Sequence, residues 1–168
     1  MSSINFHIIS RFVVLIIAQA LIFNHINFTG NINPYPYVLF ILLFPVKNNR
    51  LLFLTISFIL GLFIDLFSDS GGVHAAASLF IAFIRPPVLK FSFGTLYETQ
   101  NLKFNNTDFS NRFVYFSILI AIHHLLMFLL EIFNFSDIIL ILKKTLFSSI
   151  FTIILCILFS VIFSVKRK

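Results

Sequence analysis

The chain has 168 residues, of which 59% are hydrophobic and only 11% are charged, and it contains 25 Phe and no Trp. A soluble domain carries about 25% charged residues, so this chain has too few polar side chains to cover a water-exposed surface. The composition excludes a soluble enzyme, a disordered chain and a coiled coil, and it leaves an integral membrane protein. The formal net charge of +6 indicates basic loops on the cytoplasmic side of a membrane, without nucleic acid as a partner.

Six apolar segments predict a single polytopic, all-α membrane domain over residues 1–168. A helix needs about 20 mostly apolar residues to cross roughly 30 Å of hydrocarbon. The predicted spans cover about 8–28, 35–46, 51–67, 73–84, 113–133 and 145–165. The one cysteine, Cys156, lies inside the last span, which excludes a disulfide framework and a cysteine metal cluster.

Two of these spans are short and are bounded by prolines. The second begins at a Pro-Tyr-Pro-Tyr sequence, where Tyr35 and Tyr37 are expected to lie at the outer interface. The fourth is expected to stop at Arg85, because the two prolines that follow block continuation of a helix.

The distribution of basic residues supports both short spans. With six spans and both termini in the cytoplasm, the inner positions hold ten of the twelve cations: Arg11, Lys47, Arg50, Arg85, Lys90, Lys103, Arg112, Lys166, Arg167 and Lys168. The outer loops hold only Lys143 and Lys144. Such a bias is typical of a multi-pass protein of the cytoplasmic membrane. The longest connection, about 90–111, is interpreted either as an interfacial loop on the membrane or as a docking surface for a cytoplasmic partner.

Asp65 is the main charged residue at membrane depth. It follows Gly61 and precedes Asp69 by four residues each, so the three share one helical face. Gly61 would let another backbone approach closely. Two interpretations of Asp65 stay open: a helix-end carboxylate that accepts hydrogen bonds from backbone amides of the next turn, or a buried carboxylate that fixes packing or meets a partner.

The same three residues form half of an enzyme motif. Their G-x-x-x-D-x-x-x-D spacing resembles the second half of the signature of CDP-alcohol phosphatidyltransferases, in which several carboxylates hold divalent metals. The first half of that signature contains acids just upstream, but residues 45–52 of this chain contain none. The sequence therefore predicts no metal site here.

His123, His124 and Glu131 place polar groups on the fifth span. His124 and Glu131 are seven residues apart and fall on nearly the same helical face. The zinc pattern H-E-x-x-H is absent. We interpret the three residues as a polar seam that binds this span to its neighbours, with a proton relay as the alternative.

The stretch 58–68, FILGLFIDLFS, followed by Gly72 and three alanines, resembles the core segment of the MreD family. The resemblance extends along nearly the whole chain. Pro34 and Pro36 lead a span into a basic turn before the Gly-x-x-x-Asp span. The Arg85 exit and the segment from His123 to Glu131 resemble the MreD proteins of the Bacteroidota.

This resemblance implies a non-catalytic subunit of the bacterial rod-shape (elongasome) machinery, without a cofactor. Such a subunit binds MreC and helps to couple MreB filaments to the peptidoglycan synthase RodA and its penicillin-binding partner, and so to cell shape. The family's six-helix fold is similar to the substrate-binding subunits of energy-coupling-factor transporters. By position, the resemblance implies that Gly61, Asp65 and Gly72 are important for folding or for contact with a partner.

Two other functions stay open. The shared fold makes a vitamin-binding transporter subunit the main alternative, with Asp65, Asp69, His74 and Glu131 as candidates to line an outward-facing pocket. The second is a metal-dependent lipid-modifying enzyme, which would need Asp65 and Asp69 as ligands.

Overall fold

The computed structural model describes residues 6–26, 32–98, 102, 104 and 107–164, and its long elements are all α-helices. These are α1 (Phe6–Leu21), α3 (Arg50–Ser68), α4 (Val73–Phe93), α6 (Phe109–Ile132) and α7 (Ile138–Ser164). Within the described residues, α1 with the short 3-10 helix η1 (Phe23–His25) and the other four helices are each long and apolar enough to cross a membrane. The prediction of an all-α protein with several membrane-spanning helices is confirmed at this level.

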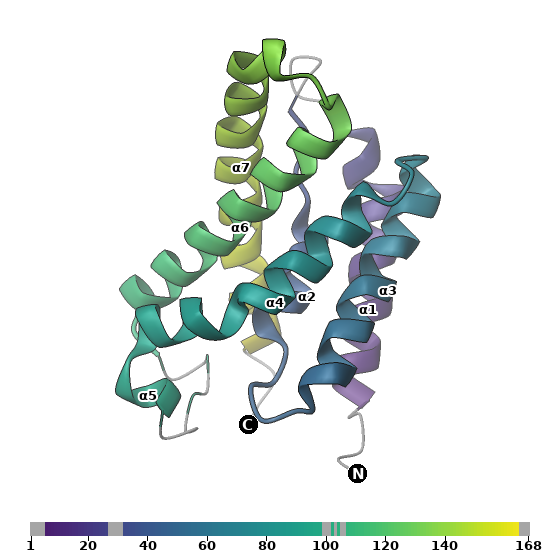
Figure 1. Ribbon diagram of the computed structural model, residues 1–168. Coiled ribbons are helices and arrows are strands. Elements are labelled where there is room, and N and C mark those ends of the chain that lie inside the picture. The colour runs from purple at the N-terminus through teal and green to yellow at the C-terminus, as the bar shows by residue number, and fades with distance from the viewer. Residues whose placement is uncertain (1–5, 27–31, 99–101, 103, 105–106, 165–168) are drawn as a thin grey trace.

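The segment between α1 and α3 is not the regular helix that we expected over 35–46. It contains a 3-10 turn, η2 (Pro36–Val38), and a helix of five residues, α2 (Leu39–Leu43). We call residues 34–44 the inner segment. Non-helical backbone at membrane depth is tolerated only where protein covers it. The inner segment meets this condition, because all its residues except the partly buried Leu43 are buried. Figure 1 shows α2 between the α6–α7 pair and the α1–α3 pair.

Helix α4 continues for two turns beyond the point at which we expected it to stop. Pro86 and Pro87 lie inside the helix, which ends before Gly94. Prolines remove backbone hydrogen bonds, but membrane helices tolerate them where neighbouring helices enclose the freed groups. The helix bends about midway along its length in Figure 1, as expected at a proline. As a consequence, Arg85 is a buried helical residue and not a loop cation.

Helix α7 begins earlier than predicted. The 3-10 turn η4 (Phe135–Asp137) leads directly into Ile138, and the Asn134 side chain accepts a hydrogen bond from the backbone N–H of Ser136 at this turn. The apolar residues 138–142 continue the helical pattern, so Lys143 and Lys144 lie in the second turn of α7 instead of in a loop.

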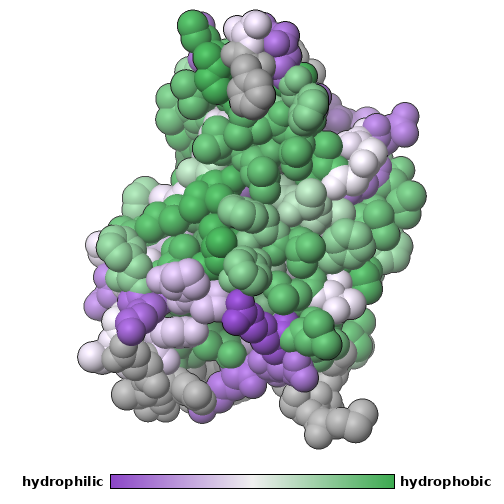
Figure 2. Space-filling model, in the orientation of Figure 1, coloured by the Kyte–Doolittle hydropathy of each residue, from purple (hydrophilic) through white to green (hydrophobic). Residues whose placement is uncertain are grey.

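The ends of the helices and the surface agree with a protein that crosses a membrane. In Figure 1, α1 begins and α7 ends at the same end of the molecule, where α3 also begins. Hydrophobic residues cover the middle of the face in Figure 2, and hydrophilic residues gather toward its two ends. In the connection that follows α4, the partly buried Phe104 stacks on Tyr115 of α6 with 5.7 Å between ring centroids. Phe104 therefore packs against the bundle.

Candidate functional site

Asp65 caps the first turn of α4 from the preceding helix. Its carboxylate accepts hydrogen bonds from the backbone N–H groups of His74 (2.9 Å) and Ala75 (2.8 Å), and from the hydroxyl of Ser70. The first N–H groups of a helix have no partner within the helix, and a carboxylate also interacts favourably with the positive end of the helix dipole. Gly72, the N-cap residue of α4, has no side chain for this purpose. The structure combines parts of both interpretations of Asp65. The carboxylate accepts backbone N–H groups at a helix end, but these belong to α4 and not to the turn 68–72, and Asp65 is buried where it fixes the packing of α3 against α4.

Gly61 lies one turn before Asp65 and lets α4 approach α3 closely. A Cβ atom at this position would lie 2.5 Å from Cα and 2.7 Å from the backbone N of Ala75, and it would also overlap the carbonyl oxygen of His74. The close approach expected at Gly61 is therefore present. Gly61 and Asp65 both contact the first turn of α4. Gly61 leaves space for its backbone, and Asp65 accepts hydrogen bonds from it.

The turn between α3 and α4 depends on left-handed backbone conformations. Asp69, Gly71 and Gly72 have φ angles of 52°, 66° and 98°. The backbone N–H groups of Asp69 and Ser70 both donate to the carbonyl of Asp65, which closes the end of α3. Glycine adopts such angles without steric cost, which accounts for Gly72 at this position. The side chain of Asp69 is exposed, so the half-motif of Gly61, Asp65 and Asp69 does not direct two carboxylates into a common buried site.

Tyr37 joins two buried histidines in the centre of the bundle. Its hydroxyl oxygen lies 2.9 Å from Nδ1 of His74 and 2.8 Å from Nε2 of His123. Among the described residues, Nδ1 of His123 has no hydrogen-bond partner. Buried N–H groups without a partner are rarer than unused acceptors. We therefore assign the His123 proton to Nε2, which donates to Tyr37, and Tyr37 donates to His74.

His124 takes part in a second chain of hydrogen bonds, with α7. The hydroxyl oxygen of Thr152 accepts from the backbone N–H of Tyr35 (3.0 Å) and lies 3.1 Å from Nε2 of His124. Nδ1 of His124 lies 2.8 Å from the carbonyl oxygen of Ile120, which can only accept, so Nδ1 carries a proton and donates it. In a neutral imidazole the other nitrogen, Nε2, is then an acceptor, and the hydroxyl of Thr152 donates to it. We assign this tautomer to His124.

Glu131 does not belong to this seam. Its side chain is 45% exposed and forms an ion pair of 3.5 Å with Lys144 of α7. The predicted seam on α6 therefore divides into three parts: His123 binds the inner segment and α4, His124 binds α7, and Glu131 pairs with a cation near the end of the helix.

Arg85 binds the C-terminal end of α2. Its Nη2 donates to the carbonyls of Leu42 (3.1 Å) and Phe44, and its Nε donates to the hydroxyl of Tyr115 at 2.7 Å. Tyr115 in turn donates to the carbonyl of Leu42 at 3.0 Å. The last carbonyls of a helix lack partners within it and favour a nearby cation. The guanidinium also lies 5.0 Å from the ring centroid of Phe53.

Side chains of four helices therefore satisfy the backbone of the inner segment. Besides Arg85 of α4, Tyr115 of α6 and Thr152 of α7, the amide of Gln19 in α1 donates to the carbonyl of Pro34 at 3.3 Å. Unpaired backbone groups are costly in the absence of water, so these polar side chains make an irregular segment possible inside the bundle.

Most of these anchoring residues were not predicted as site residues. Tyr35 and Tyr37 were expected at the outer membrane interface, but both are buried, and so is Tyr115. Arg85 was counted among the loops because its helix was expected to end there. Gln19 and Arg85 could have been identified because each is a strongly polar residue within or at the end of an apolar run. Such residues are costly inside a membrane and therefore indicate a buried polar partner.

The four residues considered for an outward-facing ligand pocket lie in different environments. Asp65 binds the backbone of α4, His74 binds Tyr37, Asp69 is exposed and Glu131 pairs with Lys144. Within the part of the chain that the structure describes, no group of three or more His, Cys, Asp or Glu side chains is arranged to hold a metal ion. Comparisons of the chain with protein families, with curated proteins and with solved structures find no match.

Proposed function

We propose that this chain is a non-catalytic membrane subunit of the bacterial rod-shape complex, with the role of an MreD protein. In this proposal it binds MreC as its main partner and couples MreB to RodA and its penicillin-binding partner during peptidoglycan synthesis. The protein would lie in the cytoplasmic membrane as a multi-pass protein, with both termini in the cytoplasm.

The observation that carries this proposal is the contact of Gly61 and Asp65 with the first turn of α4. The resemblance to MreD depends on the segment that contains these two residues. Their contacts give the Gly-x-x-x-Asp pattern a physical role, because they fix how α3 and α4 meet. A motif that shapes a helical hairpin is compatible with a scaffold, which must present a constant surface to its partners.

The buried polar groups also support a structural role. Tyr37, His74 and His123 bond to one another, while Arg85 and His124 bond to backbone carbonyls. Hydrogen bonds are stronger in a low-dielectric interior, so these bonds make one arrangement of the core more stable than its alternatives.

The proposal includes a sixth pass through the membrane. The inner segment links the end of the molecule at which α1 ends to the end at which α3 begins (Figure 1). With this segment as the second pass, the chain crosses six times and its termini lie on one side. We also propose that this six-pass fold is similar to that of the substrate-binding subunits of energy-coupling-factor transporters.

Co-purification tests the proposed partner. The tagged chain is co-expressed with the MreC protein of the same organism, extracted in a mild detergent and captured. We expect MreC to be retained, together with a smaller amount of RodA when it is also expressed. An unrelated six-span protein with the same tag and expression level serves as the control.

Retention of MreC no greater than in this control would contradict the proposal.

The neighbouring genes provide a second, independent test. If the proposal is correct, genes for MreB and MreC lie among them. Replacement of Asp65 by alanine is expected to reduce capture of MreC together with thermal stability, whereas Asp69→Asn should leave both unchanged, because its side chain is exposed.

A further inference from the structure

The hydroxyl of Tyr37 has a third polar neighbour besides His74 and His123. Ser78 follows His74 by one turn of α4, so the two share a face of this helix. The Ser78 side chain is fully buried, and its hydroxyl lies beside that of Tyr37. Nevertheless, it forms no hydrogen bond within the part of the chain that the structure describes. A buried hydroxyl without a partner is costly, so Ser78 calls for a second state of the core in which it is bonded.

The neutral state of the core leaves Ser78 unused because Tyr37 has only one proton. A hydroxyl can donate one hydrogen bond and accept two. In the arrangement described above, Tyr37 accepts from Nε2 of His123 and donates to Nδ1 of His74. A second proton on His74 would turn Nδ1 into a donor. Tyr37 would then accept from both histidines, and its own proton would need a new acceptor, which Ser78 can supply.

His74 is the histidine best placed to bind such a proton. The Asp65 carboxylate accepts from its backbone N–H at 2.9 Å, and a nearby negative charge favours the charged form of an imidazole. A second proton on His123 would lie on Nδ1, which has no acceptor among the described residues. On His124 it would lie on Nε2, where Thr152 already donates. The neighbouring charge and hydrogen bonds thus single out His74.

The titratable side chains around His74 come from three elements. The acid among those described belongs to α3, and the tyrosines of the inner segment and the histidines of α6 are neutral in the arrangement given above. The next acid on α6, Glu131, pairs with Lys144. The described titratable groups around the His74 ring are Asp65, Tyr35, Tyr37, His123 and His124.

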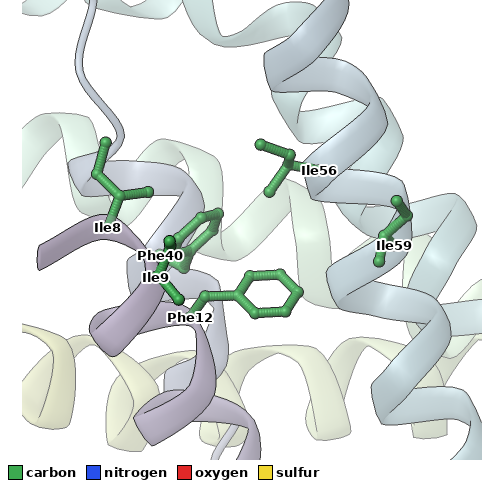
Figure 3. A pocket seen from close by; sticks show the side chains of 6 residues that line it. All are labelled: Ile8, Ile9, Phe12, Phe40, Ile56 and Ile59. Atoms are coloured by element: carbon green, nitrogen blue, oxygen red, sulfur yellow. The ribbon is translucent and has the colours of Figure 1, made fainter. Parts of the chain in front are cut away.

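A proton can reach His74 from one end of the bundle. His74 lies in the first turn of α4, and Figure 1 shows the turn before α4 at the opposite end of the molecule from the start of α1 and the end of α7. The cavity of about 170 Å³ between α1 and α3 does not offer a second path. Four isoleucines and two phenylalanines line it (Figure 3), and a wholly apolar cavity stays dry. We therefore expect His74 to exchange protons with water on the side of the α3–α4 turn.

We propose that the Tyr37 hydroxyl is a proton-sensitive switch, which donates to His74 while His74 is neutral and to Ser78 when His74 carries a second proton. The added proton comes from water and forms an N–H bond at Nδ1, and the Tyr37 hydroxyl only rotates about its C–O bond. Ser78 can then direct its own proton to a carbonyl of its helix, as helical serines do. All these groups stay hydrogen-bonded, so the core binds a proton without opening.

The test follows the protonation of each histidine in the full chain. The protein is prepared in detergent with nitrogen-labelled histidine, and the imidazole chemical shifts are recorded from neutral to acidic pH. We expect His74 to bind a second proton at a higher pH than His123 and His124, while the core stays folded. In Ser78→Ala the spectrum at neutral pH should match wild type, because Ser78 forms no bond there. Its His74 should bind the proton about tenfold more weakly, which lowers the midpoint by about one pH unit.

Ser148→Ala is the matched control, because Ser148 is also fully buried and without a described partner but lies on α7. It should leave the midpoint of His74 unchanged. An equal midpoint in wild type and Ser78→Ala would overturn the proposal, as would equal shifts in the two serine variants. In wild type alone, a proton that binds first to His123 or His124 would overturn it too. So would unfolding of the core before His74 is protonated, and these two outcomes do not depend on the folding of any variant.

Discussion

The carboxylate of Asp65 accepts a hydrogen bond from the backbone N–H of Ala75 at 2.8 Å, across the turn that joins α3 to α4. A side chain of one helix thus supplies the N-terminal cap of the next. The cap and the close contact at Gly61 act on the same turn of α4, so the hairpin is fixed at its closed end.

Replacing Asp65 by alanine should destabilise the protein by about 2–3 kcal/mol, because two buried N–H groups lose a charged acceptor. Asp65→Asn should cost less, since the amide oxygen still accepts one of these bonds. Unfolding in detergent under a titration with sodium dodecyl sulfate measures both changes. Asp69→Asn serves as the control and should shift the free energy of unfolding by less than about 0.5 kcal/mol.

Adding a single methyl group at Gly61 should destabilise the protein, although alanine is the better helix former. The new Cβ would overlap backbone atoms of Ala75, which cannot rotate away as a flexible side chain can. We expect a loss of about 1–3 kcal/mol for Gly61→Ala. Ser57→Ala, one turn earlier, removes a hydroxyl that donates to its own helix, to the carbonyl of Phe53. A smaller loss for Gly61→Ala than for Ser57→Ala would refute the close contact.

Arg85 should not be replaceable by lysine. The ammonium of lysine cannot reproduce the planar fork that binds Leu42, Phe44 and Tyr115, nor the stacking on Phe53. We expect Arg85→Lys to lower stability by about 2–4 kcal/mol through unsatisfied groups at the end of α2. Limited proteolysis of the connection 45–49 should become faster. Arg50→Lys should change both measurements much less, because Arg50 is exposed and its guanidinium lies over the exposed ring of Phe83 at 5.3 Å.

The hydrogen bonds around Thr152 predict the tautomer of His124. Nitrogen chemical shifts of the imidazole should show a neutral ring with the proton on Nδ1, because Nε2 accepts from Thr152. Thr152→Val should remove this signature and cost about 1–3 kcal/mol, since the N–H of Tyr35 also loses its acceptor. Ser160→Ala is the control, because that hydroxyl donates only to Ile157 of its own helix. A protonated Nε2 in wild type would contradict the assignment.

Cysteine labelling tests the direction of the passes. In a Cys156→Ser background, Lys47→Cys should react with an impermeant thiol reagent only from the cytoplasmic side, and Asp69→Cys only from the outer side. Both positions are exposed. Wild-type Cys156 is buried within α7 and should be inert from either side. Labelling of positions 47 and 69 from the same side would rule out α3 as a membrane pass.

The long helices could be predicted from the sequence because their apolar runs report directly on contact with lipid. The range expected for the third span, about 51–67, differs little from α3. The function of Gly61 also followed from local sequence, because a glycine in an apolar helix favours close approach. The ends of α4 and α7 did not follow. A rule based on local sequence ends a helix at two prolines. It cannot take into account that helices distant in sequence enclose the backbone groups that the prolines leave free.

The anchors of the inner segment could not be predicted for a related reason. A short span bounded by prolines gives no indication of whether its backbone bonds are internal or supplied from outside. Tyr37 and Arg85 acquire their partners only when α2, α4 and α6 come together. A tyrosine near a proline and an arginine beside two prolines are both typical of membrane interfaces. The sequence therefore predicted interfacial positions for Tyr37 and Arg85.

The dependence of the inner segment on later helices has a consequence for biosynthesis. The backbone N–H of Tyr35 donates to Thr152, 117 residues further along the chain, and the carbonyl of Leu42 accepts from Tyr115, 73 residues further along. Until the ribosome has made α6 and α7, the backbone N–H of Tyr35 and the carbonyl of Leu42 lack these two partners, although Gln19 of α1 can already bind the carbonyl of Pro34. We therefore expect residues 34–44 to settle last, after translation of α7, and a nascent chain that stops before α7 to be a substrate for membrane proteases.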